Sequence, residues 1–231
     1  MSALGSRHGP GPRIYQASNL RMAASIAILF CACSAASEST TTVPAGAAQS
    51  SESVATTVLD AINAGDVETV AANTIEEQMV WLAMAEGASL QEAAGLLDDG
   101  AGSVAVNYWT GFTQLGDVPP VAITSVVETR VGDHTFAMVS LGGTDDLRLV
   151  LRSEPEWKVD VVASFGSTLA ARLADAVDVV AANSGDEADR LREVLGDQRD
   201  SVEVAASDSG LNESARQALT RLAESLERMS S

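Results

Sequence analysis

Few residues of this 231-residue chain are of a type that could carry out acid–base or nucleophilic chemistry. The chain has two histidines, His8 and His134, and two cysteines, Cys31 and Cys33, against 32 Asp and Glu residues and 14 Lys and Arg residues. These histidines and cysteines are too few for a histidine-based metal cluster or a thiolate zinc site. The sequence also contains no glycine-rich phosphate loop, nucleophile elbow or metal-ligand spacing. It therefore predicts no catalytic set, no metal site and no cofactor.

His134 and Tyr108 are nonetheless the pair best suited to acid–base work. His134 is the titratable residue predicted for the apolar face of a sheet, and Tyr108 is the one phenol after residue 50. Proton transfer would require both groups to share a dry cavity. The aromatic residues of this region could instead form a core or line a pocket for an apolar ligand. The candidate pocket residues are Tyr108, Trp109, His134, Phe136, Met138 and Trp157.

Tyr108 and Trp109 are expected to lie on a helix, because residues 51–115 carry the 3.6-residue period of amphipathic helices. The apolar stripes at the two ends of this region are Val54, Val58 and Ile62, and Val104, Tyr108, Phe112 and Leu115. The expected helix boundaries are a stop at Gly65, an N-cap at Asp66, and capping boxes at residues 74–77 and 89–92.

The other four candidates are expected to lie on strands, because the period of the apolar residues changes to two after Pro119-Pro120. Strands are predicted over residues 121–131, 134–141, 146–152 and 156–162, as a four-stranded antiparallel meander. Val131 should pair with His134 across a two-residue turn. Loops of even length would then place Leu147, Leu149 and Leu151 on the apolar face with His134, Phe136 and Met138.

Pairing Arg152 with Glu156 adds Trp157 and Val159 to that apolar face and leaves Arg152 and Asp160 on the opposite, charged face. A slip of one residue would turn Asp160 inward. The N-terminal helices are expected to cover the apolar face, which predicts an α+β fold with a curved sheet.

Residues 167–231 are predicted to form a helical extension. Helices are expected over about 169–182, 186–195 and from an N-cap at Asn212, with a polar gap through 201–210. This extension could pack on the sheet, fill the mouth of the fold or bind a partner.

The order of these elements resembles the nuclear-transport-factor-2-like superfamily over residues 51–166. The residues that carry the resemblance are Asn63-Ala-Gly-Asp66 after the first helix and Trp157-Lys-Val-Asp160 at the end of the meander. The resemblance implies a curved sheet that wraps a long helix into a cone with an open mouth. That superfamily includes small extracytoplasmic lipoproteins without known activity, and also acid–base enzymes such as ketosteroid isomerase.

The N-terminus carries an export signature. Residues 1–33 contain three arginines and no acid, and the apolar run at 22–30 has the length of a signal-peptide core rather than of a membrane span. Ala32-Cys33-Ser34 resembles a bacterial lipoprotein signal, which implies that Cys33 is lipidated. An ordinary signal peptide is the alternative. Residues 34–50 are small and polar, as is typical of a flexible tether.

A net charge of −18 argues against binding to nucleic acid or docking on anionic lipid. The expected function is that of a lipid-anchored, non-catalytic module of the cell envelope, on the outer face of the cytoplasmic membrane, or of a secreted protein. Its partner would be an apolar small molecule or an envelope protein, and its contact with the membrane would be through the lipid alone. The alternative is a small isomerase or cyclase that uses the same apolar cone.

Overall fold

Helices and a single antiparallel sheet make up the parts of the chain that the computed structural model describes, residues 49–114, 122–142 and 148–230. The predicted α+β class is therefore confirmed. The signal segment 1–33 with Cys33, and most of the tether 34–50, lie outside the described residues. None of the described helices is long and apolar enough to cross a membrane.

Five helices precede the sheet in the described sequence: α1 (Ser51–Ala64), α2 (Val67–Ala72), α3 (Glu76–Ala85), α4 (Leu90–Asp99) and α5 (Gly102–Gln114). Their ends follow local chemistry in most cases. Gly65 takes the left-handed conformation at φ +70°, Asp66 accepts a hydrogen bond from Thr69 N, and Ser89 forms the expected capping box with Glu92.

The capping box expected at residues 74–77 is wrong. The N-cap of α3 is Ile75, which has no side chain able to cap the helix. The hydroxyl of Thr74 instead donates to Val70 O (2.8 Å) and accepts from Trp109 Nε1 (2.9 Å). The Thr74 hydroxyl is therefore engaged in these two hydrogen bonds and does not cap the N-terminus of α3.

The sheet is the predicted meander, with strand order β1-β2-β3-β4. Its strands are β1 (Ala122–Val131), β2 (His134–Gly142), β3 (Leu149–Glu154) and β4 (Glu156–Val159). The predicted pair of Val131 with His134 is confirmed.

The predicted register between β2 and β3 is wrong by one residue. Leu149 pairs with Val139 and Leu151 with Ala137, whereas Arg152 pairs with Phe136. Because side chains alternate along a strand, this shift moves the two leucines away from the face of His134, Phe136 and Met138. Arg152 also pairs with Lys158 rather than with Glu156. Leu147, which was expected beside these leucines, lies outside the described residues.

As a consequence, β2 and β3 carry buried residues on both faces of the sheet, whereas β1 is exposed or half-buried along its length. The face with Ala137, Val139, Leu149 and Leu151 joins the main core together with residues of the N-terminal helices. On the other face, Phe136 and Val150 form a smaller cluster with Ala163 of α6 and Val204 of α8. Each of these faces therefore combines residues that were predicted for opposite faces: Arg152, expected on the charged face, lies on the same side as Phe136, expected on the apolar face, and this side is a second interior.

The C-terminal helices are α6 (Val161–Ala182), α7 (Asp186–Gly196), α8 (Arg199–Ala206) and α9 (Glu213–Met229). The domain boundary expected at residue 166 falls inside α6, and all the described residues belong to one compact unit, so the chain does not divide there. The polar gap expected at 201–210 is wrong over its first half, which forms α8 and buries Val202, Val204 and Ala205. Asn212 caps α9 as predicted.

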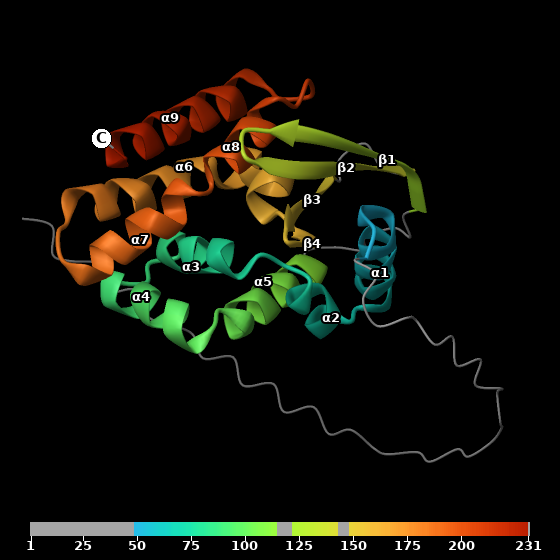
Figure 1. Ribbon diagram of the computed structural model, residues 1–231, viewed down its shortest axis with the longest axis horizontal. Coiled ribbons are helices and arrows are strands. Elements are labelled where there is room, and N and C mark those ends of the chain that lie inside the picture. The colour runs from blue at the N-terminus through green and yellow to red at the C-terminus, as the bar shows by residue number, and fades with distance from the viewer. Residues whose placement is uncertain (1–48, 115–121, 143–147, 231) are drawn as a thin grey trace, which may run out of the picture. The chain divides into compact units, whose positions relative to one another are not determined.

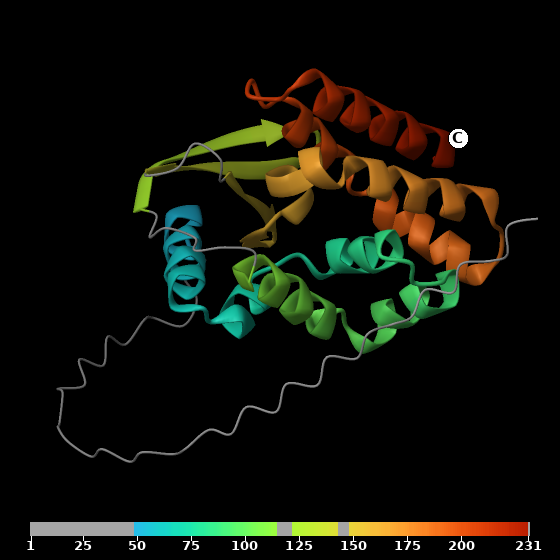
Figure 2. The ribbon, with the colours of Figure 1, turned by 180° about the vertical axis from the view of Figure 1, so that it is seen from behind.

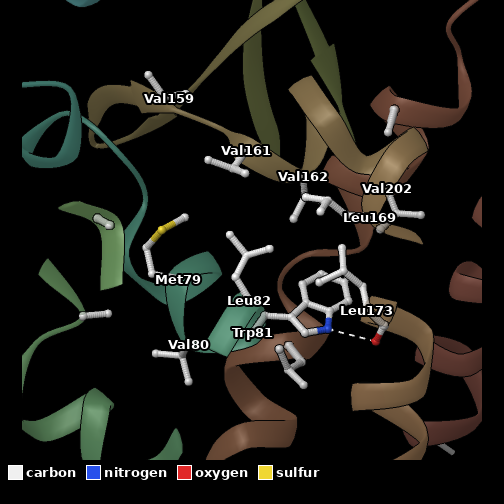
Figure 3. Packing of buried hydrophobic residues seen from close by; sticks show 14 of the residues in the cluster. Met79, Val80, Trp81, Leu82, Val159, Val161, Val162, Leu169, Leu173 and Val202 are labelled. Carbon is white, nitrogen blue, oxygen red and sulfur yellow. Dashed lines mark hydrogen bonds between the residues drawn. The ribbon is translucent and has the colours of Figure 1, made fainter. Parts of the chain in front are cut away.

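Helix α6 is the element around which the core is built. It lies beside α9 along much of its length, and α7 lies beside α4 (Figure 1). The reverse view places α1 next to β1, at the end of the sheet away from α7 (Figure 2). Within the core, Trp81 of α3 points at α6 and donates from Nε1 to Leu173 O at 3.0 Å (Figure 3). N-terminal and C-terminal helices therefore share one interior.

Candidate functional site

An apolar cavity of about 450 Å³ opens between the end of α3 and one side of α5. Its lining residues are Leu82, Ala83, Glu86, Val104, Asn107, Tyr108, Gly111 and Phe112. The five from α5 follow the i, i+3, i+4, i+7, i+8 spacing of a single helix face. We refer to this cavity as the α3–α5 pocket.

Small residues keep the α3–α5 pocket open. Gly111 has no side chain, and a Cβ added to it would meet no atom within 4 Å. Ala83 contributes only a methyl group from the opposite helix. The pocket therefore exists because each of the two helices contributes a small residue where a larger one would fill the space.

Aromatic rings form the support of this pocket. The ring of Trp109 is fully buried and lies 5.3 Å from those of both Tyr108 and Phe112, in edge-to-face contact with each. Phe165 of α6 lies 5.5 Å from Phe112. The hydrogen bond from Trp109 Nε1 to Thr74 fixes the indole at the centre of this group. Such rings give the pocket a rigid apolar wall.

The polar groups of the pocket are poorly suited to proton transfer. Burial raises the pKa of the Tyr108 phenol well above its usual range, an effect that Arg172 partly opposes, so the hydroxyl is neutral at physiological pH. Glu86 is exposed at the rim and forms an ion pair with Arg172. The arrangement can bind and orient an apolar molecule, but it places no buried base beside it.

A second cluster, built entirely from polar groups, lies where α3, β3 and the α7–α8 junction meet α6. We call it the polar seam; its buried members are Gln78, Arg152, Asp160, Gln198 and Ser201. Asp160 caps α6 by accepting from Ala163 N at 2.7 Å, and it also accepts from Gln78 Nε2 at 2.8 Å and Ser201 Oγ at 2.6 Å. Each of these bonds joins Asp160 to a different helix.

Gln78 and Arg152 complete the interior of the seam. Gln78 Oε1 accepts from Val161 N at 2.7 Å, and its Nε2 also donates to Gln198 Oε1 at 2.8 Å. The fully buried Arg152 donates from Nη1 to Ser201 Oγ at 3.1 Å, and its Nε lies 3.7 Å from Asp160 Oδ2. A buried guanidinium thus faces a buried carboxylate, with neutral groups filling the remaining positions.

The outer rim of the polar seam contains His134. Its Nδ1 lies 2.8 Å from Asp200 Oδ2, and its Nε2 lies 3.7 Å from Asp197 Oδ2 and 3.9 Å from Glu154 Oε1. Glu154 is in ion-pair contact with Arg152. Burial raises the pKa of the Glu154 carboxyl, as do the nearby charges of Glu77 and Asp197, whereas Arg152 and His134 lower it.

The six predicted pocket residues do not gather at one place. Tyr108 lines the α3–α5 pocket and Trp109 lies beneath it, whereas His134 belongs to the rim of the seam. Phe136 is buried under α8, Met138 is half-buried near Arg148, and Trp157 is half-buried against the main core. Tyr108 and His134 therefore have different surroundings, and His134 is not among the residues that line the α3–α5 pocket.

Several residues of these two regions were not among the predicted site residues. Gly111 could have been noticed as a glycine inside an otherwise strong helical pattern, which is a signal for close approach or open space. Asp160 could have been noticed as an N-cap, because it directly precedes the apolar run that begins α6. Gln78 carries no such local signal, since its role comes only from the packing of α3 on α6.

Comparison of the chain with protein-family models, with curated proteins and with solved structures finds no match.

Proposed function

We propose that this protein is an extracytoplasmic, non-catalytic module, lipid-anchored through Cys33, that binds an apolar small molecule in the α3–α5 pocket. The observation that carries the proposal is the pocket itself, an apolar cavity of about 450 Å³ with a rigid aromatic wall. Binding sites for small molecules usually have volumes of roughly 300–1,000 Å³ and mostly apolar linings with a few polar groups.

The polar groups of the pocket suit orientation rather than chemistry. The Tyr108 hydroxyl and the Asn107 amide offer neutral hydrogen bonds, and the Glu86–Arg172 ion pair lies at the rim. We do not propose an acid–base enzyme, because Tyr108 and His134 lie in different regions. The proposed location rests on the basic, apolar and cysteine-containing segment 1–33 of the sequence.

The binding proposal can be tested with a neutral fluorescent probe, N-phenyl-1-naphthylamine, whose emission rises in apolar surroundings. The decisive variant is Gly111→Leu, which adds a side chain directly into the pocket. The matched control is Gly95→Leu on α4, because Gly95 is also helical and a Cβ there also meets nothing within 4 Å. Gly95 does not line the α3–α5 pocket.

We expect the parent chain and Gly95→Leu to bind the probe with equal affinity, and Gly111→Leu to bind it at least about tenfold more weakly. Equal binding by all three proteins would contradict the proposal, because the probe would then be binding elsewhere. The anchor is tested separately, by intact-mass analysis of the membrane fraction from cells that carry Cys33 or Cys33→Ala. Only the Cys33 protein should gain the mass of acyl chains.

A further inference from the structure

We infer that the rim of the polar seam is a binding site for a divalent transition-metal ion, with His134, Glu154 and Asp197 as its ligands. One ligand atom from each of these residues lies within 4.8 Å of the other two. A chain with so few histidines excludes a histidine-rich cluster but not a site that combines one imidazole with carboxylates. This inference is independent of the proposed function of the α3–α5 pocket.

The imidazole of His134 is held in the orientation that a metal ligand requires. Asp200 Oδ2 lies 2.8 Å from Nδ1, and a carboxylate oxygen at this distance accepts a hydrogen bond from that ring nitrogen. Nε2 is therefore the ring nitrogen available to a metal ion, which would displace any proton that it carries. Metal-binding histidines commonly have their other ring nitrogen held by a carboxylate in this way.

Asp200 is itself held in place by the β1–β2 turn. Its Oδ2 also accepts from Asp133 N at 3.0 Å. A Cβ on Gly132, which has a φ of +56°, would lie 2.3 Å from Asp200 Oδ1. Glycine at this turn is therefore what allows the carboxylate to reach the hairpin and the His134 ring.

The ring nitrogen Nε2 faces two carboxylate oxygens that could bind the same metal ion. It lies 3.7 Å from Asp197 Oδ2 and 3.9 Å from Glu154 Oε1. Acceptors that face one another repel unless a proton or a metal ion lies between them. The distances are suitable, because bonds of ~2.0–2.2 Å to one ion place tetrahedral ligand atoms about 3.3–3.6 Å apart. All three ligand atoms lie within 4.8 Å of one another, and Asp197 can move closer because its side chain is 56% exposed.

Arg152 is the group that competes with a metal ion here. Its Nη2 is in contact with Glu154 and lies 3.9 Å from Asp197 Oδ2. However, neither Nη2 nor Nε of this fully buried side chain makes a hydrogen bond of good geometry. The guanidinium is also shared among Asp160, Glu154 and Asp197, so it cannot neutralise the whole group.

The ligand types select the class of metal. One imidazole nitrogen with two carboxylate oxygens suits Zn²⁺ or Mn²⁺ better than the all-oxygen sites that Ca²⁺ and Mg²⁺ prefer. We therefore expect Zn²⁺ to bind more tightly than Mn²⁺, and both more tightly than Ca²⁺.

The test is a calorimetric titration of the full chain with Zn²⁺, together with metal analysis after dialysis. Cys31 and Cys33 are changed to Ser in every protein, so that thiols do not bind the metal. We expect one Zn²⁺ per chain in this background, and a rise in Tm when Zn²⁺ is added. The variants that should lose the metal are His134→Gln and Asp197→Asn, and their two controls are exposed acids on neighbouring helices, Glu193→Gln on α7 and Glu203→Gln on α8.

We expect His134→Gln and Asp197→Asn to weaken binding at least about tenfold and to lose the rise in Tm, whereas the two controls bind as the parent does. If His134→Gln does not fold, Asp197→Asn decides the question, because its side chain is half-exposed. The inference is overturned if the parent binds no stoichiometric Zn²⁺, or if Asp197→Asn and Glu193→Gln bind it equally well. Tighter binding of Ca²⁺ than of Zn²⁺ would also overturn it.

Discussion

The α3–α5 pocket and the polar seam are reached from the same helix. Gln78 in the first turn of α3 lies in the seam, and Leu82, one turn later, faces the pocket. The seam is filled, because a polar group taken out of water must find a partner and therefore draws other groups against it. The pocket is open, because apolar surfaces have no such requirement and small residues line it on both sides. The difference suggests that the seam fixes the architecture, whereas the pocket is free to accept a ligand.

The largest effect is expected from removing the guanidinium of the seam. Arg152→Met keeps most of the apolar stem but leaves Asp160 as a buried carboxylate without a counter-charge. Breaking a buried ion pair in this way costs about 3–5 kcal/mol of unfolding free energy. Urea denaturation followed by circular dichroism measures this loss.

The control for this substitution is Arg199→Met, which breaks an exposed ion pair with Glu227. Exposed pairs contribute about 1 kcal/mol or less. If the two variants lost the same stability, the seam would be no more important to the fold than a surface ion pair, and the contrast drawn between the two regions would fail.

A second test concerns the contact between the β1–β2 turn and Asp200. Gly132→Ala and Gly65→Ala both place a side chain at a positive φ, which costs about 1–2 kcal/mol. A Cβ at Gly65 meets nothing within 4 Å, whereas one at Gly132 would overlap the Asp200 carboxylate. We therefore expect Gly132→Ala to lose about 1–3 kcal/mol more than Gly65→Ala, measured by the same denaturation.

Combining Gly132→Ala with Asp200→Ala should remove this additional loss, because the overlapping carboxylate is gone. An additional loss that persisted in the double variant would mean that the turn, rather than its contact with the rim of the seam, is the sensitive feature.

A smaller effect, with the opposite sign, is expected at the pocket. Gly111→Ala should stabilise the protein by about 0.5–1 kcal/mol, because alanine is the better helix former and the new methyl group enters open space. Gly166→Ala on α6 has the same helical advantage, but its Cβ would lie 3.2 Å from Ala205 Cβ. We expect no gain at Gly166. Equal gains at both positions, measured as a rise in Tm, would show that α6 and α8 are as loosely packed as the wall of the pocket.

The sequence was informative wherever contacts are local. The pairing of Val131 with His134 follows from a two-residue turn, and the capping box at Ser89 follows from residues three apart. The α5 stripe of Val104, Tyr108 and Phe112 likewise predicted the helix face that lines the pocket. In these cases a few neighbouring residues contain all the necessary information.

The sequence was misleading wherever a long-range contact decides between two local solutions. The β2–β3 connection holds an odd number of residues between Val139 and Leu149, and a one-residue error exchanges the faces of a strand. That error placed Arg152 in solvent, and the predicted continuation of the last strand to residue 162 placed Asp160 there, although both side chains are fully buried and Asp160 caps α6. The polar seam could not be predicted for this reason, since its members come from α3, the sheet and α8 and meet only after the fold has formed.

The smallest effect is expected from Tyr108→Phe in the α3–α5 pocket. This substitution should leave stability at neutral pH almost unchanged and alter only its dependence on alkaline pH. Burial raises the pKa of Tyr108, so the folded state holds the phenolic proton more tightly than the unfolded state does. The resulting stabilisation is fully present below the ordinary phenol pKa of about 10 and is lost as the pH rises through the higher folded-state pKa. Tyr108→Phe should therefore match the parent in stability between pH 6 and 9, and only above about pH 10 should the parent lose stability more steeply.

The ionisation of Tyr108 can also be followed directly, through the absorbance of phenolate at alkaline pH. The chain has two tyrosines, and the later of the two ionisation steps should be missing in Tyr108→Phe. If Tyr108 instead titrated at its ordinary pKa, its ring would be in contact with water, and the pocket would be a shallow surface rather than an apolar cavity.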